Sequence, residues 1–467
     1  MSRRHEQIAE AFDHTFQWIL QGDQDDVNTT EGAQVNDLVS LQRATRTNFI
    51  SWLRSGSGIF WIDGKAGSGK STLMKLIFHS PETRVHLRHW SGSCDLFVGH
   101  FHFFDRGSSL EKSQEGLIRH LLYQIFERYP HLMNEVYKSH WDRLRGAGRA
   151  YLRTDPTAKY LYEAILTRSE LVAALQAVLF STIGKVRICF LIDGLDEFNG
   201  TDREVLELMA QLESMYAKSA TWHKICVSSR PHIAFEAAFR KRPSLRMQDL
   251  TKNDIYHYVN SRLRSQDLPI DHLAPEDLVR FETLVDDIVE KARGVFLWVH
   301  LAVMSLLHGL DQSDWMHELE ARVRGLPPEL DTFYDRMVNL IDPGYRYQAA
   351  RIFRIMLDSP DPPHPLILSF LENNNDDIDR HPREAFSYKA LNARGKHMEQ
   401  RLRSRFWGLI EISRQTTSIA DWSKSTTADW TKFNALFFHQ TVRDYFKRPE
   451  PWKMMLDGMT VSWCSME

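Results

Sequence analysis

Residues 59–72 read Ile-Phe-Trp-Ile-Asp-Gly-Lys-Ala-Gly-Ser-Gly-Lys-Ser-Thr, and the rest of the chain is organised around them. A short apolar run leads into the pattern Gly-x-x-x-x-Gly-Lys-Ser, and apolar residues at helical spacing follow from Leu73 to Phe78. The order strand, glycine-rich loop, helix is the context that a phosphate-binding P-loop requires. A chance match in a chain of this length is expected in about one sequence in a hundred. The stretch therefore predicts nucleotide binding.

The chemistry of this loop depends on its backbone and on two side chains. Glycines let successive backbone N–H groups turn inward around the phosphates, and the helix N-terminus adds a partial positive charge. We expect Lys70 to reach the β- and γ-phosphates and the Ser71 hydroxyl to bind Mg²⁺. The predicted nucleotide-binding residues of the loop are Gly64, Lys65, Ala66, Gly67, Ser68, Gly69, Lys70, Ser71 and Thr72.

A second apolar run, Val186 to Asp193, is typical of a fully buried parallel strand. It ends in the acidic sequence Asp193-Gly194-Leu195-Asp196-Glu197. An acidic residue at the C-terminal end of such a strand, downstream of a P-loop, matches the Walker B role of holding Mg²⁺ through water. Taken alone, the same residues are equally typical of a turn after a strand. Their pairing with the P-loop favours the Mg²⁺ interpretation.

Further strands are predicted over 94–104, over 225–228 before Ser229-Arg230-Pro231, and over 245–250. Helical spacing separates them, as over 113–127, and residues 130–182 are mostly helical in pattern. Alternating strands and helices predict a parallel α/β sheet. Ligands of such a sheet bind beyond the C-terminal ends of its strands, where Lys70, Asp193 and Arg230 are all expected to lie.

The segments on either side of the sheet have a helical pattern. Residues 3–20 predict a first helix that ends at Gly22, and a second is predicted over about 38–54. Beyond residue 250 helices are predicted over 253–263, 278–292, 296–310, 315–323, 330–341, 344–358, 365–371 and 395–405. Apolar runs over 406–412 and 433–439, followed by a helix over 440–446, predict a hairpin and a winged helix.

Composition places the chain among multidomain globular proteins. Its 467 residues predict two to four domains, and its net charge of −3 gives no electrostatic reason to expect nucleic acid or an anionic membrane as a partner. The four cysteines are far apart, which favours free thiols in a reducing, cytoplasmic location. The N-terminus is neither a signal nor a transit peptide in pattern, and no apolar stretch is long enough to span a bilayer.

With these parts in place, the sequence resembles the NACHT branch of the STAND NTPases, and within it the fungal NOD-like receptors. The resemblance rests on the P-loop, on Phe190 to Glu197 and on Ser228-Ser229-Arg230-Pro231. Further matching motifs are Leu250-Thr251 with Asp254-Ile255, Gly294-Val295-Phe296-Leu297-Trp298, and Phe438-His439-Gln440 before Val442-Arg443-Asp444-Tyr445. Together these motifs extend over about residues 59–446.

The resemblance implies a signalling switch that binds ATP or ADP with Mg²⁺ and hydrolyses ATP slowly. In such proteins nucleotide exchange converts a closed monomer into an open oligomer, joined through the nucleotide-binding domain, that triggers innate-immunity-like or incompatibility and cell-death signalling. Asp193, with Ser71, would hold Mg²⁺, and Asp196 or Glu197 would orient the attacking water. Arg230 would sense the γ-phosphate, and His439 would bond the β-phosphate of ADP and so lock the winged helix shut.

The resemblance also implies a division into domains. It predicts a helical lead-in over 1–47, a P-loop domain with a parallel sheet over 48–249 and an all-α helical domain over 250–325. A winged-helix domain would cover 326–447, and a C-terminal tail 448–467. Full receptors add an effector domain and repeats, so we expect a fragment, a truncated product or a short form acting in trans.

The sequence departs from the related families at one position and leaves two alternatives open. Where those families carry Gly-x-Pro against adenine, this chain has Gly294-Val295-Phe296 without the proline. One alternative is a P-loop ATPase or kinase with substantial turnover on a substrate, although no other substrate-site motif is present in the sequence. The other is a winged-helix regulator that binds DNA through Arg401, Arg403 and Arg405, which are more often a solvated helix face.

Overall fold

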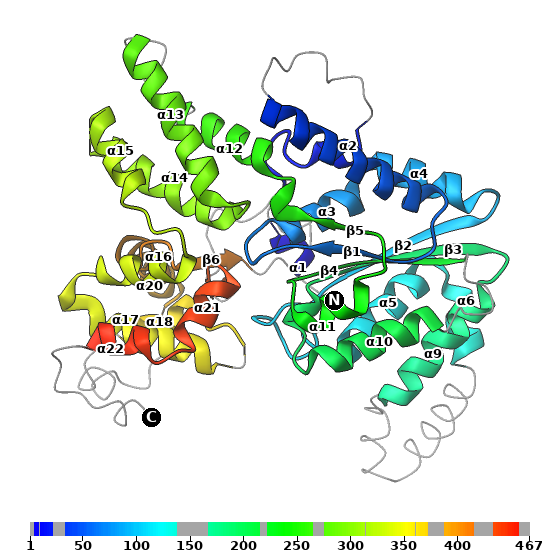
Figure 1. Ribbon diagram of the computed structural model, residues 1–467. Coiled ribbons are helices and arrows are strands. Elements are labelled where there is room, and N and C mark those ends of the chain that lie inside the picture. Colours follow the sequence, from blue (N-terminus) through cyan, green and yellow to red (C-terminus); the bar gives the residue numbers. More distant parts are fainter. Residues whose placement is uncertain are drawn as a thin grey trace, which may run out of the picture. The chain divides into compact units, whose positions relative to one another are not determined.

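The computed structural model describes residues 4–8, 10–21, 33–137, 167–214, 222–264, 275–312, 314–359, 361–371, 387–414 and 433–456 (Figure 1). The chain forms two compact units. The N-terminal unit comprises Met1–Asp105 and Ser109–Val303, and the C-terminal unit comprises Arg106–Ser108 and Met304–Glu467. Parts of the helical pattern over 130–182 and of the predicted C-terminal tail lie outside the described residues.

The N-terminal unit contains a five-stranded parallel sheet in the order β2-β3-β4-β1-β5. Its strands are β1 (Gly58–Asp63), β2 (Asp95–His102), β3 (Val186–Asp193), β4 (His223–Ser229) and β5 (Ser244–Arg246). The predicted parallel α/β core is confirmed. Since Asp63 pairs with Ser229 and His102 pairs with Asp193, the strands end together at one edge of the sheet.

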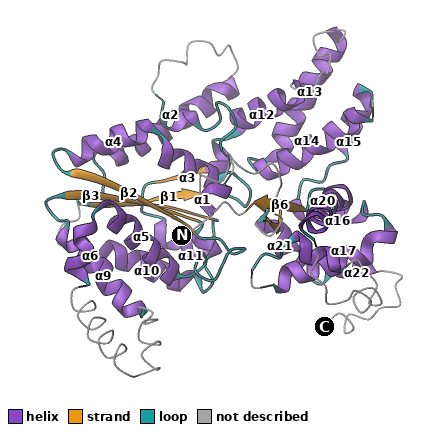
Figure 2. Cartoon of the chain, turned by 180° about the vertical axis from the view of Figure 1, so that it is seen from behind, coloured by secondary structure: helices purple, strands orange, loops and turns teal. Residues whose placement is uncertain are grey.

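Alternation along each strand divides the apolar side chains between two hydrophobic cores, one on each face of the sheet. On β1, Ile59 and Trp61 face one core, whereas Phe60 and Ile62 face the other. The first core is completed by α5 (Gln114–Arg128), α6 (Pro130–Val136), α9 (Arg168–Ser181), α10 (Asp202–Ser214) and α11 (Ile233–Phe239). The second is completed by α2 (Ala33–Arg54), α3 (Lys70–His79) and α4 (Pro81–Ser91). Figure 2 shows the helices on both faces of the sheet.

The N-terminal segment is not the continuous helix predicted over 3–20. Over residues 4–8 and 10–20, which the structure describes, it contains only α1 (Arg4–Gln7) and the 3-10 turn η1 (Gln17–Ile19). Phe16 has a φ of 62°, and its backbone N–H donates to the Asp254 carboxylate at 3.0 Å. A residue in this left-handed conformation cannot continue a right-handed helix. The apolar spacing nevertheless identified buried residues, because Phe16, Ile19 and Leu20 all enter the second core.

Three helices follow the sheet along the chain, as predicted. They are α12 (Lys252–Arg264), α13 (Pro275–Ala292) and α14 (Phe296–Asp311), which runs across the boundary between the two units at Val303. The first of them is tied to the N-terminal segment, because Asp254 also accepts a hydrogen bond from the Trp18 indole at 2.9 Å.

Where the structure describes it, the C-terminal unit contains helices and one antiparallel pair of strands, β6 (Ile410–Arg414) and β7 (Phe433–Phe437). Its helices are α15 (Met316–Arg324), α16 (Leu330–Asn339), α17 (Pro343–Asp358), α18 (Pro365–Phe370), α20 (Tyr388–Arg405), α21 (Gln440–Phe446) and α22 (Glu450–Leu456). The sequence pattern did not predict α22. This helix belongs to the folded unit because Trp452 is buried, lies 5.8 Å from the Phe446 ring and donates to the Phe446 carbonyl.

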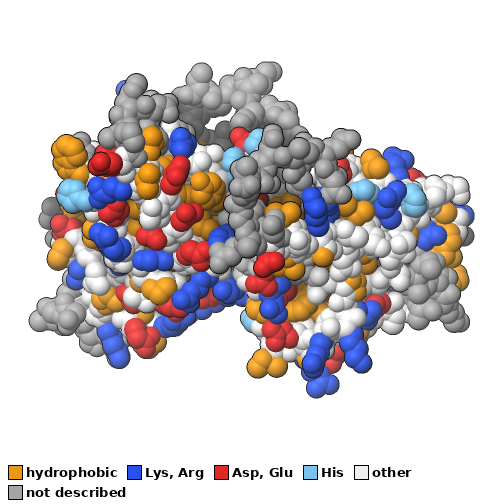
Figure 3. Space-filling model, turned by 45° about the horizontal axis from the view of Figure 1, so that its top comes forward, with side chains coloured by type: hydrophobic (Ala, Val, Ile, Leu, Met, Phe, Trp, Pro, Cys, Tyr) orange, Lys and Arg blue, Asp and Glu red, His pale blue; other side chains and the backbone are white. Residues whose placement is uncertain are grey.

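The surface carries charges of both signs. On the face shown in Figure 3, lysines and arginines are interspersed with aspartates and glutamates. Within the described part of the chain, no helix is both long and apolar enough to cross a bilayer.

We predict that Asp254→Ala lowers the free energy of unfolding by about 2–3 kcal/mol, because the buried N–H of Phe16 and the half-buried indole N–H of Trp18 lose their carboxylate acceptor. Chemical denaturation measures this loss. Asp249→Ala is the control, since its side chain is 51% exposed and should change stability by less than about 0.5 kcal/mol.

The pH dependence of stability distinguishes loss of the Asp254 carboxyl group from a packing defect caused by the substitution. Burial raises the pKa of Asp254 to about 6, although hydrogen bonds from Trp18 and Phe16 oppose the shift. Between about pH 4 and pH 6 the folded state therefore binds more protons than the unfolded state. Protonation of Asp254 stabilises the fold at low pH, and this stabilisation is lost as the pH rises through 6. The stability difference between wild type and Asp254→Ala should shrink over that window; a constant difference would contradict the assignment.

Candidate functional site

The predicted P-loop joins β1 to α3 in the conformation that phosphate binding requires. Gly67 and Gly69 adopt φ values of +70° and +93°, which side-chain-bearing residues rarely adopt. Gly69 is the N-cap of α3, so the first backbone N–H groups of this helix lie at the end of the loop. The Ser68 hydroxyl is buried inside the loop, and a side chain on Gly64 would collide with it at 2.5 Å. The loop therefore tolerates glycine alone at these positions.

Lys70 lies at the centre of this loop. Its ammonium donates to the carbonyl oxygens of Gly64 at 2.7 Å and Lys65 at 2.9 Å. Burial lowers the pKa of Lys70, whereas the carboxylate of Asp196 opposes this shift. The Lys70 ammonium is thus held by carbonyl oxygens of the loop, at the C-terminal edge of the sheet.

Asp193 ends β3 and is 2% exposed. Its carboxylate accepts hydrogen bonds from the Ser228 hydroxyl of β4 and, at 3.1 Å, from His102 Nδ1 of β2. Burial alone would raise the pKa of Asp193, but hydrogen bonds from His102, Ser228 and Ser71 outweigh it and hold the pKa at about 2. An ionised carboxylate beside the Ser71 hydroxyl has the oxygen ligands that Mg²⁺ prefers. The residues present therefore fit a Mg²⁺ ion.

Two further carboxylates follow Asp193 on the 3-10 turn η3 (Leu195–Glu197). Asp196 is paired with Arg230, whose Nε lies 2.9 Å from Oδ2 and whose backbone N–H donates to Oδ1 at 3.0 Å. Glu197 accepts from the backbone N–H of Asp105 at 3.2 Å. Arg230 and Asp196 had been assigned separate roles from the sequence, and the structure joins them in one ion pair.

Segments remote in sequence pack directly against the loop. The backbone N–H of Leu297, at the start of α14, donates to the Gly67 carbonyl at 3.0 Å. The Phe16 ring would collide with any side chain on Gly69 at 2.8 Å, and it lies 5.3 Å from the Phe296 ring. The Gly294-Val295-Phe296 stretch therefore adjoins the P-loop, although it lacks the proline of the related families.

His439 belongs to the C-terminal unit, where it is the N-cap of α21. Its Nδ1 accepts the backbone N–H of Thr441 at 3.2 Å and lies 2.9 Å from the Thr441 hydroxyl. An Nδ1 that accepts from a backbone amide carries no proton, so the neutral ring has its proton on Nε2.

Sequence reasoning missed two partners of Asp193. His102 reaches it because strands β2 and β3 pair in register, and Ser228 reaches it from the next strand. The only sequence signal was position, since both residues lie near the predicted C-terminal ends of their strands. The contact itself depends on the strand order, which the sequence does not state.

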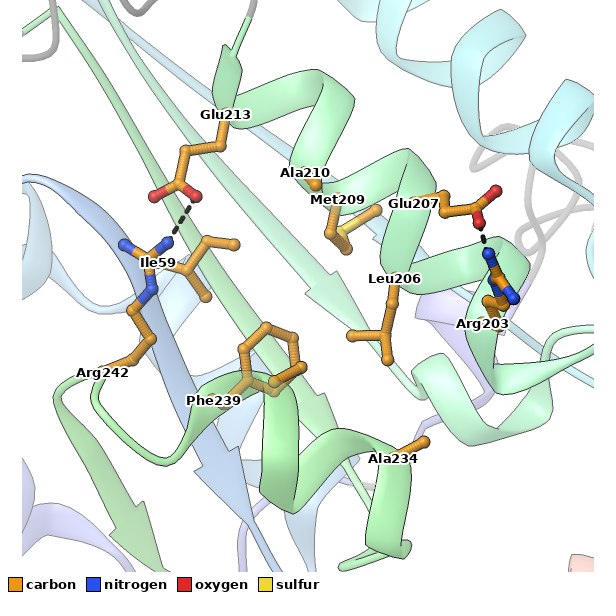
Figure 4. Close-up of a pocket in the computed structure, with 11 residues that line it drawn as sticks. Ile59, Arg203, Leu206, Glu207, Met209, Ala210, Glu213, Ala234, Phe239 and Arg242 are labelled. Carbon is orange, nitrogen blue, oxygen red and sulfur yellow. Dashed lines mark hydrogen bonds and ion pairs between the residues drawn. The ribbon is translucent and has the colours of Figure 1, made fainter.

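A groove of about 440 Å³ lies elsewhere in the N-terminal unit, between α10, α11 and the start of β1 (Figure 4). Ile59 lines it, and the ion pairs Arg242–Glu213 and Arg203–Glu207 lie along it. Since the P-loop follows the opposite end of β1, this groove is separate from the phosphate site.

Comparison with known families agrees with this geometry. Residues 43–230 match the family described as Nephrocystin 3, N-terminal. This match supports a STAND-like NTPase module over these residues. Residues 340–463 match a second family, Domain of unknown function (DUF7791). No curated protein matches the chain.

Several solved structures are similar to the chain. The Aeropyrum pernix ORC2 protein in ADPNP–ADP complexes is 10% identical, with a TM-score of 0.34 over 95% of this chain and 99% of that chain. The Walker-type ATPase of Pyrococcus abyssi is 11% identical, with a TM-score of 0.35 over 87% and 95%. Cdc6p from Pyrobaculum aerophilum is 12% identical, with a TM-score of 0.33 over 94% and 97%.

We predict that Lys70→Ala weakens ATP and ADP binding to the NTPase module by at least about tenfold, because a charge-assisted contact to phosphate is lost. Lys70→Arg should fail as well, since a planar fork replaces a compact ammonium. Calorimetric titration measures the affinities.

Lys185→Ala is the control. Lys185 is exposed and immediately precedes β3, at the end of this strand opposite Asp193, so its loss should leave nucleotide affinity nearly unchanged. Unchanged ATP affinity in a folded Lys70→Ala protein would refute the P-loop assignment.

Proposed function

We propose that this chain is a nucleotide-controlled signalling switch of the NACHT/STAND type that binds ATP or ADP with Mg²⁺ and hydrolyses ATP slowly. The observation that carries the proposal is the convergence of Lys70, Ser71 and the ionised Asp193 at the C-terminal edge of the sheet. These residues supply a phosphate cation, a Mg²⁺-binding hydroxyl and a Mg²⁺-binding carboxylate.

The Arg230–Asp196 ion pair supports slow hydrolysis. A carboxylate that orients the attacking water must accept a proton or a hydrogen bond from it. Asp196 is 4% exposed on its side chain and is already paired with Arg230. A γ-phosphate would compete with the Asp196 carboxylate for the Arg230 guanidinium. Arg230 would therefore sense ATP by breaking its ion pair with Asp196. Glu197 is the second carboxylate near enough in sequence to act on water.

His439 is proposed as the residue that senses ADP. Its Nδ1 is occupied by the Thr441 amide, so Nε2 presents the donor. Donation to the β-phosphate would contribute roughly 1.5–3 kcal/mol, which biases a two-state equilibrium by about ten- to a hundredfold. This bond would form only in a closed, ADP-bound state.

We retain the domain division implied by the resemblance: 1–47, 48–249, 250–325, 326–447 and 448–467. The winged-helix domain would comprise α16, α17, α18, α20 and α21 with the β6–β7 pair, and α22 lies beyond residue 447. Opening would release the nucleotide-binding domain for self-association in cell-death or defence signalling.

The contacts of the basic cluster do not favour DNA binding. Arg403 is paired with Glu399 at 2.9 Å, and the Arg405 guanidinium lies 3.8 Å from the centre of the Tyr345 ring. Both side chains are engaged within their own unit, as expected for a helix face that stabilises its own fold.

We predict that Asp196→Asn and Glu197→Gln each retain ATP while slowing its hydrolysis by about a hundredfold, because the carboxylates act on water and not on the base or ribose. Single-turnover phosphate release measures the rate. Asp202→Asn is the control, since Asp202 pairs with His232 on the surface and takes no part in the site. If both variants hydrolyse ATP at the parental rate, neither carboxylate has the proposed role.

For His439 the structure offers two substitutions that separate capping from nucleotide sensing. His439→Leu removes both functions, whereas His439→Asn keeps an N-cap acceptor for the Thr441 amide. We predict that both variants release ADP about ten- to a hundredfold faster and favour the open or assembled form. Only His439→Leu should also lose about 0.5–2 kcal/mol of stability.

Stopped-flow release of a fluorescent ADP and sedimentation velocity measure these effects. His317→Leu, an exposed histidine of the same unit, is the control. If His439→Asn releases ADP at the wild-type rate, His439 only caps its helix.

A further inference from the structure

Histidines from four elements gather beside the edge strand of the sheet. His5 comes from α1, His79 is the last residue of α3, His100 and His102 lie on β2, and His120 lies on α5. The His5 ring centre lies 4.2 Å from that of His100 and 4.9 Å from that of His79. One ring nitrogen from each of His5, His100 and His102 lies within 4.8 Å of the other two.

The fold fixes these side chains from independent directions. His100 and His102 are two residues apart on β2 and therefore point to the same face of the sheet. The side-chain amide of Gln124 holds the backbone of His100. It accepts a hydrogen bond from the His100 N–H at 3.1 Å and donates one to the His100 carbonyl at 2.8 Å. The N-terminal segment is fastened to α3 because the buried Lys75 ammonium donates to the Ile8 carbonyl at 2.7 Å.

Hydrogen bonding explains only part of this cluster. His102 Nδ1 donates to Asp193, His102 Nε2 lies 2.8 Å from His5 Nδ1, and His5 Nε2 lies 2.8 Å from His79 Nε2. Neutral rings whose protons all point toward Asp193 satisfy this chain. The buried Nδ1 of His100, however, has no hydrogen-bond partner among the described residues.

The surroundings of His5 and His100 favour the neutral form of these two rings. Burial, followed by the neighbouring histidines, lowers the pKa of His5 to about 3 and that of His100 to about 2. Neutral imidazole is the ligand form of histidine. Three neighbouring imidazoles, two half-buried and one buried, with an unsatisfied nitrogen on His100, suit a borderline-soft cation such as Zn²⁺ better than Mg²⁺, which prefers oxygen.

We propose that His5, His100 and His102 bind one Zn²⁺ ion, with His5 Nδ1 and His102 Nε2 as two of the ligand atoms. Zn–N distances of 2.0–2.1 Å place tetrahedral ligand nitrogens about 3.3 Å apart. On binding the ion, His5 Nδ1 and His102 Nε2 would move apart slightly from their present 2.8 Å. The widest separation between ligand nitrogens, at most 4.8 Å, would shorten. Three protein ligands leave a fourth position for water.

In His5 and His102, the ring nitrogen that would not bind the metal already lies beside the hydrogen-bond acceptor that such a site needs. Metal-bound histidines usually donate their second N–H to a carboxylate or another acceptor, which orients the ring. His102 donates Nδ1–H to Asp193, and His5 would donate Nε2–H to His79. The ion would thus fasten α1 to β2 and fix the ring that holds the Walker B carboxylate.

The test uses the full chain without a histidine tag. After treatment with a chelator, the protein is titrated with Zn²⁺ against a chromophoric competitor, in excess Mg²⁺ so that oxygen-ligand sites are occupied. Co²⁺ is then substituted, because its visible absorption reports tetrahedral nitrogen coordination. We expect one Zn²⁺ per chain, tetrahedral Co²⁺ bands and a melting temperature raised by several degrees.

Variants decide which residues hold the ion. His5→Ala, in a short terminal helix, should weaken Zn²⁺ binding by at least tenfold and abolish the Co²⁺ bands without disturbing the sheet. His100→Asn should do the same, and the exposed His89→Ala on α4 should bind like wild type. The proposal is overturned if wild type shows no tetrahedral Co²⁺ bands, or if His5→Ala binds Zn²⁺ as tightly as wild type. Nucleotide affinity, measured in parallel, tests the proposed switch separately.

Discussion

The buried carboxylate of Asp193 is the constraint on which the site depends. It accepts hydrogen bonds from His102 on β2, from Ser228 on β4 and from Ser71 on the helix that follows the P-loop. A buried charge without such donors would be strongly unfavourable, so three separate elements must hold their positions to keep it ionised. The same arrangement places the loop, the acidic turn and the strand ends within reach of one Mg²⁺ ion.

The P-loop is held by parts of the chain that follow and precede the sheet. Leu297 bonds to the Gly67 carbonyl, and Phe16 packs on Gly69. Phe16 is itself held by Asp254, on the first helix after the sheet. A displacement of α12 or α14 would change these contacts with the loop, which gives a physical basis for coupling the proposed nucleotide state to the helices that follow.

The sequence was sufficient wherever local pattern decides structure. The P-loop and β3 were predicted because their apolar runs, glycines and acidic ends are contiguous. The N-terminal helix was predicted wrongly, because a contact between Phe16 and Asp254, 238 residues apart, determines the backbone there. His102 and the Arg230–Asp196 pair were missed for a similar reason: strand order and register bring them together, and neither is visible in a local pattern.

The central claim is that Lys70, Ser71 and Asp193 form a nucleotide site that holds ADP in a resting switch. Identifying the nucleotide that co-purifies with the chain tests this claim most directly. Protein released by denaturation and separated by ion-exchange chromatography should yield close to one ADP per chain, and Lys70→Ala should yield almost none. A wild-type protein that is folded but carries no nucleotide, and that binds none when ADP and Mg²⁺ are added, would contradict the account.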